Sequence, residues 1–207
     1  MSRLRLALLA GVVAAFSAFA TAAAAQAHEF KVEGVGITTS HSIAGKETGQ
    51  VQELSGTPFG VAVHINCKKV EVTSGSIEPA GLGKATLSYT ECTATKPANC
   101  TVKTPIVAKV KTALVENAGV LENEFKPETG EEFTTITLEG ASCALKEPFT
   151  VTGSQLCSLP GHENELVQHE LVCTTAGSKL KAGGKPATYK GGITELHLTT
   201  LEKWSAI

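Results

Sequence analysis

Apolar and polar residues alternate along much of this chain, which is the pattern of β-strands with one buried face. From Phe59 to Cys67 every second residue is apolar, and His64 falls on the opposite, polar face. The same period of two predicts further strands at 85–89, 106–114, 133–138, 149–151, 167–173 and 194–198.

Clusters of glycine and proline separate these strands. They lie at 56–58, 78–81, 126–130 and 182–186, and such residues are typical of turns. Short strands with frequent turns predict an all-β fold, an antiparallel sandwich or barrel, in a single domain over residues 28–207. The polar segment 38–56 predicts a mobile loop, and 117–125 is the one place where we expect a short helical turn.

The N-terminal residues have the three parts of an export signal. Arg3 and Arg5 form a basic start, an alanine-rich apolar run covers 6–25, and Ala25-Gln26-Ala27 fits the small-residue cleavage pattern. We therefore expect residues 1–27 to be a signal peptide and His28 to begin the mature chain. The alternative is a retained membrane anchor, for which the run is nearly long enough. No later segment is apolar enough to cross a bilayer, so we expect no membrane insertion after cleavage.

Charge and composition narrow the functional classes. After Arg5 the chain has 16 basic residues, all lysine, against 20 acidic residues, all glutamate, so residues 28–207 carry a net charge of −4. This weak acidity argues against nucleic acid as a partner. Without arginine the chain lacks a rigid two-point binder of phosphates, and without aspartate it lacks the usual acid of a serine–histidine triad. Both absences make an enzyme less expected.

Six cysteines follow the signal peptide, and an even number in an exported protein predicts three disulfides. Only seven residues lie between Cys92 and Cys100, and they include Lys96-Pro97-Ala98-Asn99, a turn sequence. We expect Cys92 to bond Cys100 and Cys157 to bond Cys173. By elimination, Cys67 would then pair with Cys143.

A set of short motifs lies between residues 57 and 154. It comprises Pro58-Phe59 through Cys67, Tyr89-Thr90-Glu91-Cys92, Cys100, Cys143 and Val151-Thr152-Gly153-Ser154. This set resembles a group of exported β-proteins that occur as many paralogues in high-GC actinobacteria. The resemblance implies an exported, all-β product and carries no activity. Cys157 and Cys173 are an addition to the four-cysteine core of that group.

A second, local resemblance concerns the segment from Cys157 to His162. It is similar to the copper loop of blue-copper proteins, in which a cysteine and a histidine five residues later bind one ion. The resemblance implies Cys157 as thiolate, His162 as one imidazole, and His64 or His41 as the second. Leu166 stands near the place of the axial methionine. A zinc set of Cys157, His162, His169 and Cys173 has suitable ligand types but no common zinc spacing. The competing interpretation is the Cys157–Cys173 disulfide.

The sequence supports a secreted or cell-envelope module that binds or coats through its loops and is not an enzyme, with no cofactor. A copper-binding electron-transfer domain is the alternative. A hydrolase with paired glutamates, such as Glu131-Glu132 or Glu163 with Glu165, is a third hypothesis. The partner itself stays unknown, since no motif identifies one.

Overall fold

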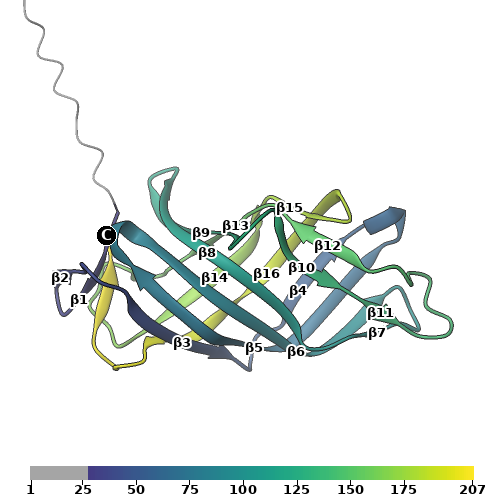
Figure 1. Ribbon diagram of the computed structural model, residues 1–207, viewed down its shortest axis with the longest axis horizontal. Coiled ribbons are helices and arrows are strands. Elements are labelled where there is room, and N and C mark those ends of the chain that lie inside the picture. Colours follow the sequence, from purple (N-terminus) through teal and green to yellow (C-terminus); the bar gives the residue numbers. More distant parts are fainter. Residues whose placement is uncertain (1–27) are drawn as a thin grey trace, which may run out of the picture.

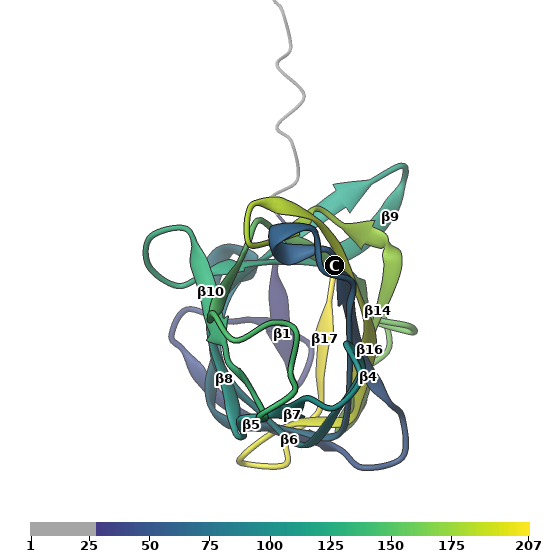
Figure 2. The same cartoon turned by 90° about the vertical axis from the view of Figure 1, so that its right-hand side faces the viewer.

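Antiparallel strands wind into a closed barrel (Figures 1 and 2). The computed structural model describes residues 28–207, so the predicted signal peptide and its cleavage site lie outside the described residues. Four strands run along most of the barrel wall: β5 (Val63–Glu78), β6 (Leu82–Lys96), β8 (Ile106–Asn117) and β16 (Lys185–Leu198). The all-β prediction is confirmed, and of the two predicted architectures the structure is the barrel.

The other four positions of the wall are each occupied by two consecutive strands that share one direction. These pairs are β3 (His41–Glu47) with β4 (Gln52–Gly56), β9 (Val120–Pro127) with β10 (Glu132–Ile136), β12 (Phe149–Thr152) with β13 (Gln155–Ser158), and β14 (Gln168–Ser178) with β15 (Leu180–Ala182). Neighbours in the wall follow chain order, and β16 closes the ring by pairing with both β3 and β4. The fold is therefore an eight-position up-and-down barrel in which four positions hold one continuous strand and four hold a strand that is broken into two.

Short elements close the two ends of the barrel. At the first, which we call the plug end, β1 (Phe30–Val32), β2 (Val35–Gly36) and β17 (Trp204–Ala206) form a small separate sheet. Figure 2 shows β1 and β17 within the outline of the barrel wall. At the second, the loop end, β7 (Thr101–Val102) pairs with β11 (Leu138–Glu139). The 3-10 turn η1 (Pro58–Gly60) precedes β5, and the 3-10 turn η2 (Pro79–Gly81) joins β5 to β6.

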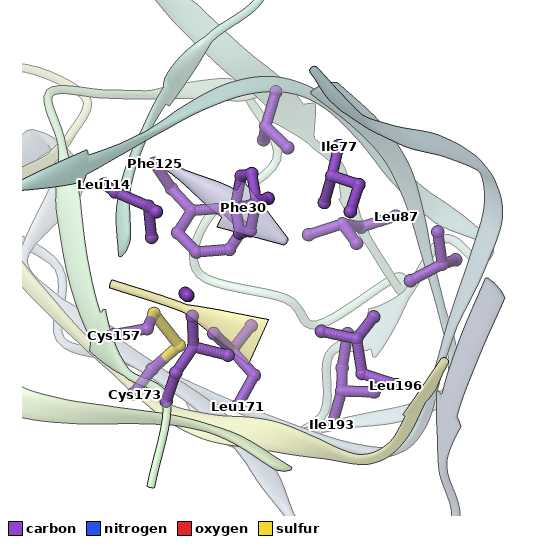
Figure 3. Close-up of a cluster of buried hydrophobic side chains, with 14 of the residues drawn as sticks. Phe30, Ile77, Leu87, Leu114, Phe125, Cys157, Leu171, Cys173, Ile193 and Leu196 are labelled. Atoms are coloured by element: carbon purple, nitrogen blue, oxygen red, sulfur yellow. A yellow bond between two sulfur atoms is a disulfide. The ribbon is translucent and has the colours of Figure 1, made fainter. Parts of the chain in front are cut away.

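Two apolar clusters fill the barrel, one toward each end. The cluster at the plug end contains Phe30, Phe125 and Trp204 and is shown in Figure 3, where the Cys157–Cys173 disulfide lies beside Leu171. The cluster at the loop end contains Ile65, Ile136 and other residues around the Cys100–Cys143 disulfide. Within residues 28–207, no helix is long and apolar enough to span a bilayer.

Two expectations about irregular segments were wrong. Segment 38–56 is not a loop, because β3 and β4 lie within it and join the wall. Its buried positions include the polar residues Glu47 and Gln52, which are satisfied by hydrogen bonds. Because these buried residues are polar, the segment lacks the alternation of apolar and polar residues that predicts a strand. Segment 117–125 is not helical. It is the β8–β9 hairpin, whose turn residues Ala118 and Gly119 both have positive φ, as a two-residue hairpin turn requires.

Other predicted strands were confirmed with different limits. The first does not begin at Phe59, which lies in η1 with φ of 51° and is 55% exposed. It begins instead at Val63 and continues to Glu78, well past the predicted end. β5 and β6 extend beyond the regular alternation because they pair with each other over almost their whole length.

Three disulfides connect the six cysteines. The predicted Cys157–Cys173 bond is present and joins directly paired residues of β13 and β14. The predicted Cys92–Cys100 and Cys67–Cys143 pairs were wrong. Cys92 instead bonds Cys67, its direct partner across the β5–β6 ladder, at a Cα separation of 3.8 Å. Cys100 bonds Cys143, because the chain leaves β6 at Lys96 and turns toward β11.

Candidate functional site

The residues proposed for copper do not form a metal site. The sulfur of Cys157 is bonded to that of Cys173, so neither can supply a thiolate to copper or zinc. Among the residues that the structure describes, no group of three or more histidine, cysteine, aspartate or glutamate side chains is placed to hold a metal ion. The disulfide thus overturns both the copper and the zinc hypotheses.

Two of the candidate histidines instead hold the plug against the barrel. His162 Nδ1 lies 2.7 Å from the carbonyl oxygen of Ala206, and His169 Nε2 lies 2.7 Å from that of Trp204. Both carbonyls belong to β17. Burial lowers the pKa of His169, partly offset by its hydrogen bond to Trp204, so this ring is neutral at pH 7 and donates from Nε2.

The third candidate ligand, His64, lies elsewhere, on the outer face of β5. Its Nε2 is 3.1 Å from Glu53 Oε1, and Lys190 Nζ is 3.1 Å from Glu53 Oε2. Partial burial opposes ionisation of Glu53, but Lys190 and His64 together lower its pKa. These three residues form a surface ion-pair group on β4, β5 and β16, which ties together the wall strands.

An internal cavity lies where the two apolar clusters meet, in the middle of the barrel. Its volume is about 120 Å³. Most of its wall consists of inward-facing aliphatic and aromatic side chains and of two disulfides, and every wall strand position contributes. Representative lining residues are Leu54, Ile65, Leu87, Tyr89, Ile106, Ala108, Val110, Phe125, Phe133, Ile136, Val151, Leu171, Leu180, Tyr189 and Ile193.

Few polar side chains reach this cavity, and hydrogen bonds within the protein engage Gln52, Gln155 and Tyr189. Gln52 Oε1 accepts hydrogen bonds from the Tyr189 hydroxyl at 2.5 Å and from the Gly192 amide at 3.0 Å. Gln155 Nε2 donates to the Thr174 carbonyl at 3.0 Å. A Cβ on Gly191 would lie 2.1 Å from Gln52 Oε1, so the glycine at this position leaves the space that the glutamine occupies.

The only two tyrosines of the chain lie next to each other in the wall of the cavity. The rings of Tyr89 and Tyr189 meet edge to face with centroids 6.3 Å apart. Burial raises the pKa of Tyr89, and burial together with the neighbouring Tyr89 raises the pKa of Tyr189 well above its usual value. Both phenols are therefore neutral hydrogen-bonding groups over the physiological range.

This environment has a measurable consequence for alkaline titration. We expect the absorbance of phenolate at 295 nm at pH 10 to be lower in the folded protein than in the unfolded one, because ionisation would place a charge in the apolar interior. The folded pKa of each tyrosine is raised, so the free energy of unfolding should be unaffected below about pH 10 and should fall as the pH rises above it. In urea the same protein should titrate near pH 10. The same titration curve with and without urea would contradict the enclosed position.

The lining determines which chemistry the cavity can accommodate. Among residues 28–207, no lysine, glutamate or histidine lines the cavity, so these residues supply no group of suitable pKa for general acid–base catalysis near neutral pH and no partner for a charged ligand. An apolar cavity of about 150 Å³ in another protein stays dry and binds benzene. The geometry therefore suits an uncharged apolar molecule of about one ring.

Sequence reasoning missed this site. Gln52 lay in the segment predicted to be a loop, and Tyr189 lay in a stretch for which no strand was predicted. The available signals were the Gly-Gly pair at 191–192 inside an otherwise extended segment and the restriction of tyrosine to two positions.

Comparison of the chain with family models, with curated proteins and with solved structures found no match. The resemblance to exported actinobacterial β-proteins consequently stays a prediction.

Proposed function

We propose that this protein is an exported, non-enzymatic barrel that binds a small, uncharged apolar molecule in its interior. The observation that carries the proposal is the apolar cavity of about 120 Å³ between the two core clusters. Eight-stranded barrels have interiors that side chains can fill or that can hold one small ligand. Here the side chains leave a space, and Tyr89 and Tyr189 present aromatic surface to it.

Three further features support the proposed location and the choice of a small-molecule partner. Three disulfides staple a chain of this size, which is typical of an oxidising compartment. The N-terminal segment has the composition of an export signal. The weak net charge offers no attraction for nucleic acid. We therefore place the protein outside the cytoplasm, secreted or in the cell envelope, with a small molecule as its partner.

Binding of benzene, with benzoate as the charged comparison, tests the proposal. We expect benzene to shift the methyl NMR signals of cavity residues in a saturable way, at one molecule per chain. Benzoate should have no effect there, because burying its carboxylate without a partner is costly. Uniform small shifts over the surface with no saturation would contradict a specific cavity site.

A cavity-filling variant provides the matched control. Ala108 is buried on β8 and lines the cavity, so Ala108→Leu should abolish benzene binding by occupying the space. Ala176→Leu makes the same change at an exposed position of β14 and should leave binding unchanged. If the two variants bind benzene equally, the ligand lies elsewhere.

A further inference from the structure

Between β8 and β10 the described part of the barrel wall contains a stretch where the adjacent strands form no backbone ladder. β8 pairs with β6 along one edge, and on the other edge it pairs with β9 only from Val110 onward. Beyond that point β10 takes the place of β9, yet β10 pairs only with β12. Within the described residues, the edges of β8 at 106–108 and of β10 at 133–136 therefore face each other without ladder hydrogen bonds. We call this stretch the seam.

A backbone hydrogen bond bounds the seam on the side of each barrel end. Toward the plug end, the Glu128 amide donates to the Lys109 carbonyl at 3.0 Å. Toward the loop end, the Lys103 amide donates to the Thr137 carbonyl at 3.0 Å, and β7 and β11 then pair. The wall is thus continuous on both sides of the seam, which makes the seam a local window and not the free edge of an open sheet.

The cavity and an outer groove meet at this window. The groove lies on the outside of β8 and β10 and is lined by Val107, Lys109, Thr129, Glu132, Phe133 and Thr134. The inner face of β8 contributes Ile106, Ala108 and Val110 to the cavity. Phe133 and Thr134 line both spaces, so they are the layer that separates the groove from the cavity. Figure 2 shows β10 and β8 along the same side of the barrel.

Both ends of the barrel are closed more firmly than the seam. At the plug end, Phe30 and Trp204 are fully buried, and β17 is held by the two histidine contacts and by the Leu166–Trp204 bridge. At the loop end, the Cys100–Cys143 disulfide ties the segment that carries buried Leu145 across the opening. Opening either end breaks buried apolar packing or covalent restraint, whereas the seam has no ladder hydrogen bonds, and Phe133 and Thr134 are the residues that line both the cavity and the groove.

We infer that the small apolar ligand enters and leaves through this seam, with Phe133 as the gating side chain. The inference rests on the proposed binding function and adds its route. The mouth carries one lysine and one glutamate, Lys109 and Glu132, so it offers no net field to select a charged molecule. The size of Phe133 then limits how fast an apolar molecule can pass between β8 and β10.

Binding kinetics of benzene, measured by NMR exchange, test the route. Phe133→Ala should raise the association and dissociation rate constants together, several-fold each, and Phe133→Trp should lower both. A side chain that merely contacts bound ligand would alter chiefly the dissociation rate. Phe59→Ala is the matched control, because Phe59 is exposed and lines neither the cavity nor the groove. Rate constants that do not change in the two Phe133 variants, or a change in dissociation alone, would overturn the gate.

Hydrogen exchange tests the seam without any ligand. Amides of β10 that face β8 should exchange through local opening, with protection well below that of the β5–β6 ladder. Equal protection in both places would show that the seam opens only with global unfolding and would overturn the inference even if benzene binds. Absence of benzene binding with a labile seam would instead overturn the proposed function, and with it the ligand route.

Discussion

Trp204→Ala should lower the free energy of unfolding by about 3–5 kcal/mol, the usual loss for truncating a large buried aromatic residue. Trp204 is 1% exposed and is the largest side chain of the plug. Its ring contacts Phe30 at a centroid separation of 6.0 Å and His169 at 4.2 Å. Removing the ring leaves both partners beside a void and loosens β17, so the plug loses packing from several directions. Urea denaturation followed by far-ultraviolet circular dichroism measures the loss.

Trp204→Phe is the informative control for this variant. The indole nitrogen of Trp204 is buried and has no hydrogen-bond partner among the described residues, so replacing the indole by a phenyl ring removes an unsatisfied donor while keeping much of the packing. The loss of stability should therefore be much smaller than for alanine. Equal losses of stability in the two variants would contradict the view that packing of an aromatic ring at position 204 holds the plug.

Removal of the Cys100–Cys143 disulfide should have the second large effect. With a sequence separation of 43, it closes the longest loop of the three bonds. The chain-entropy model gives about 4 kcal/mol for a loop of this length, against about 3 kcal/mol for the Cys157–Cys173 loop. The double variant Cys100→Ser with Cys143→Ser should also expose the loop end, where Leu138 and Leu145 pack around the bond. Urea denaturation of the purified variant measures the difference.

The pair Cys157→Ser with Cys173→Ser is the comparison for that experiment. Both sets remove one disulfide, yet Cys157 and Cys173 lie in directly paired strands that the β13–β14 ladder already holds together. We expect their loss to cost less stability and to leave hydrogen exchange at the loop end unchanged. A larger effect from the Cys157–Cys173 pair would show that local packing, and not loop length, determines what each bond contributes.

The sequence predicted the class of the fold because strand alternation is a local property. Residues 106–114 show it plainly, and β8 lies there. The Cys67–Cys92 pairing was not predictable in the same way, because it depends on the register between β5 and β6, which the long hairpin sets. Short loop length favoured Cys92–Cys100, but β6 continues past Cys92 and keeps that sulfur in the ladder.

The cavity was harder to predict than the fold. The cavity lies where several positions of the wall change from one strand to the next, as from β9 to β10. The sequence of one segment does not show that its neighbour in the barrel is interrupted at the same height. Gln52 illustrates the difficulty. A glutamine in a polar segment predicts a loop, and its burial depends on hydrogen bonds from Tyr189 and Gly192, which lie far along the chain. The copper hypothesis failed for a related reason. A correct local spacing of Cys157 and His162 says nothing of the sulfur of Cys173 on the neighbouring strand.

The plug also constrains the order in which the strands of the exported chain assemble. β1 precedes every strand of the barrel wall and β17 follows every one, yet the two pair with each other along their whole length. β1 must therefore wait, without its partner, until all wall strands have been exported, and β3 must wait nearly as long for β16. Contacts of such wide sequence separation form late and slowly. Hairpins such as β5–β6 can consequently form first, because both of their strands are close in sequence. The barrel closes and its end is plugged only when the final strands, β16 and β17, pair with β3 and β1.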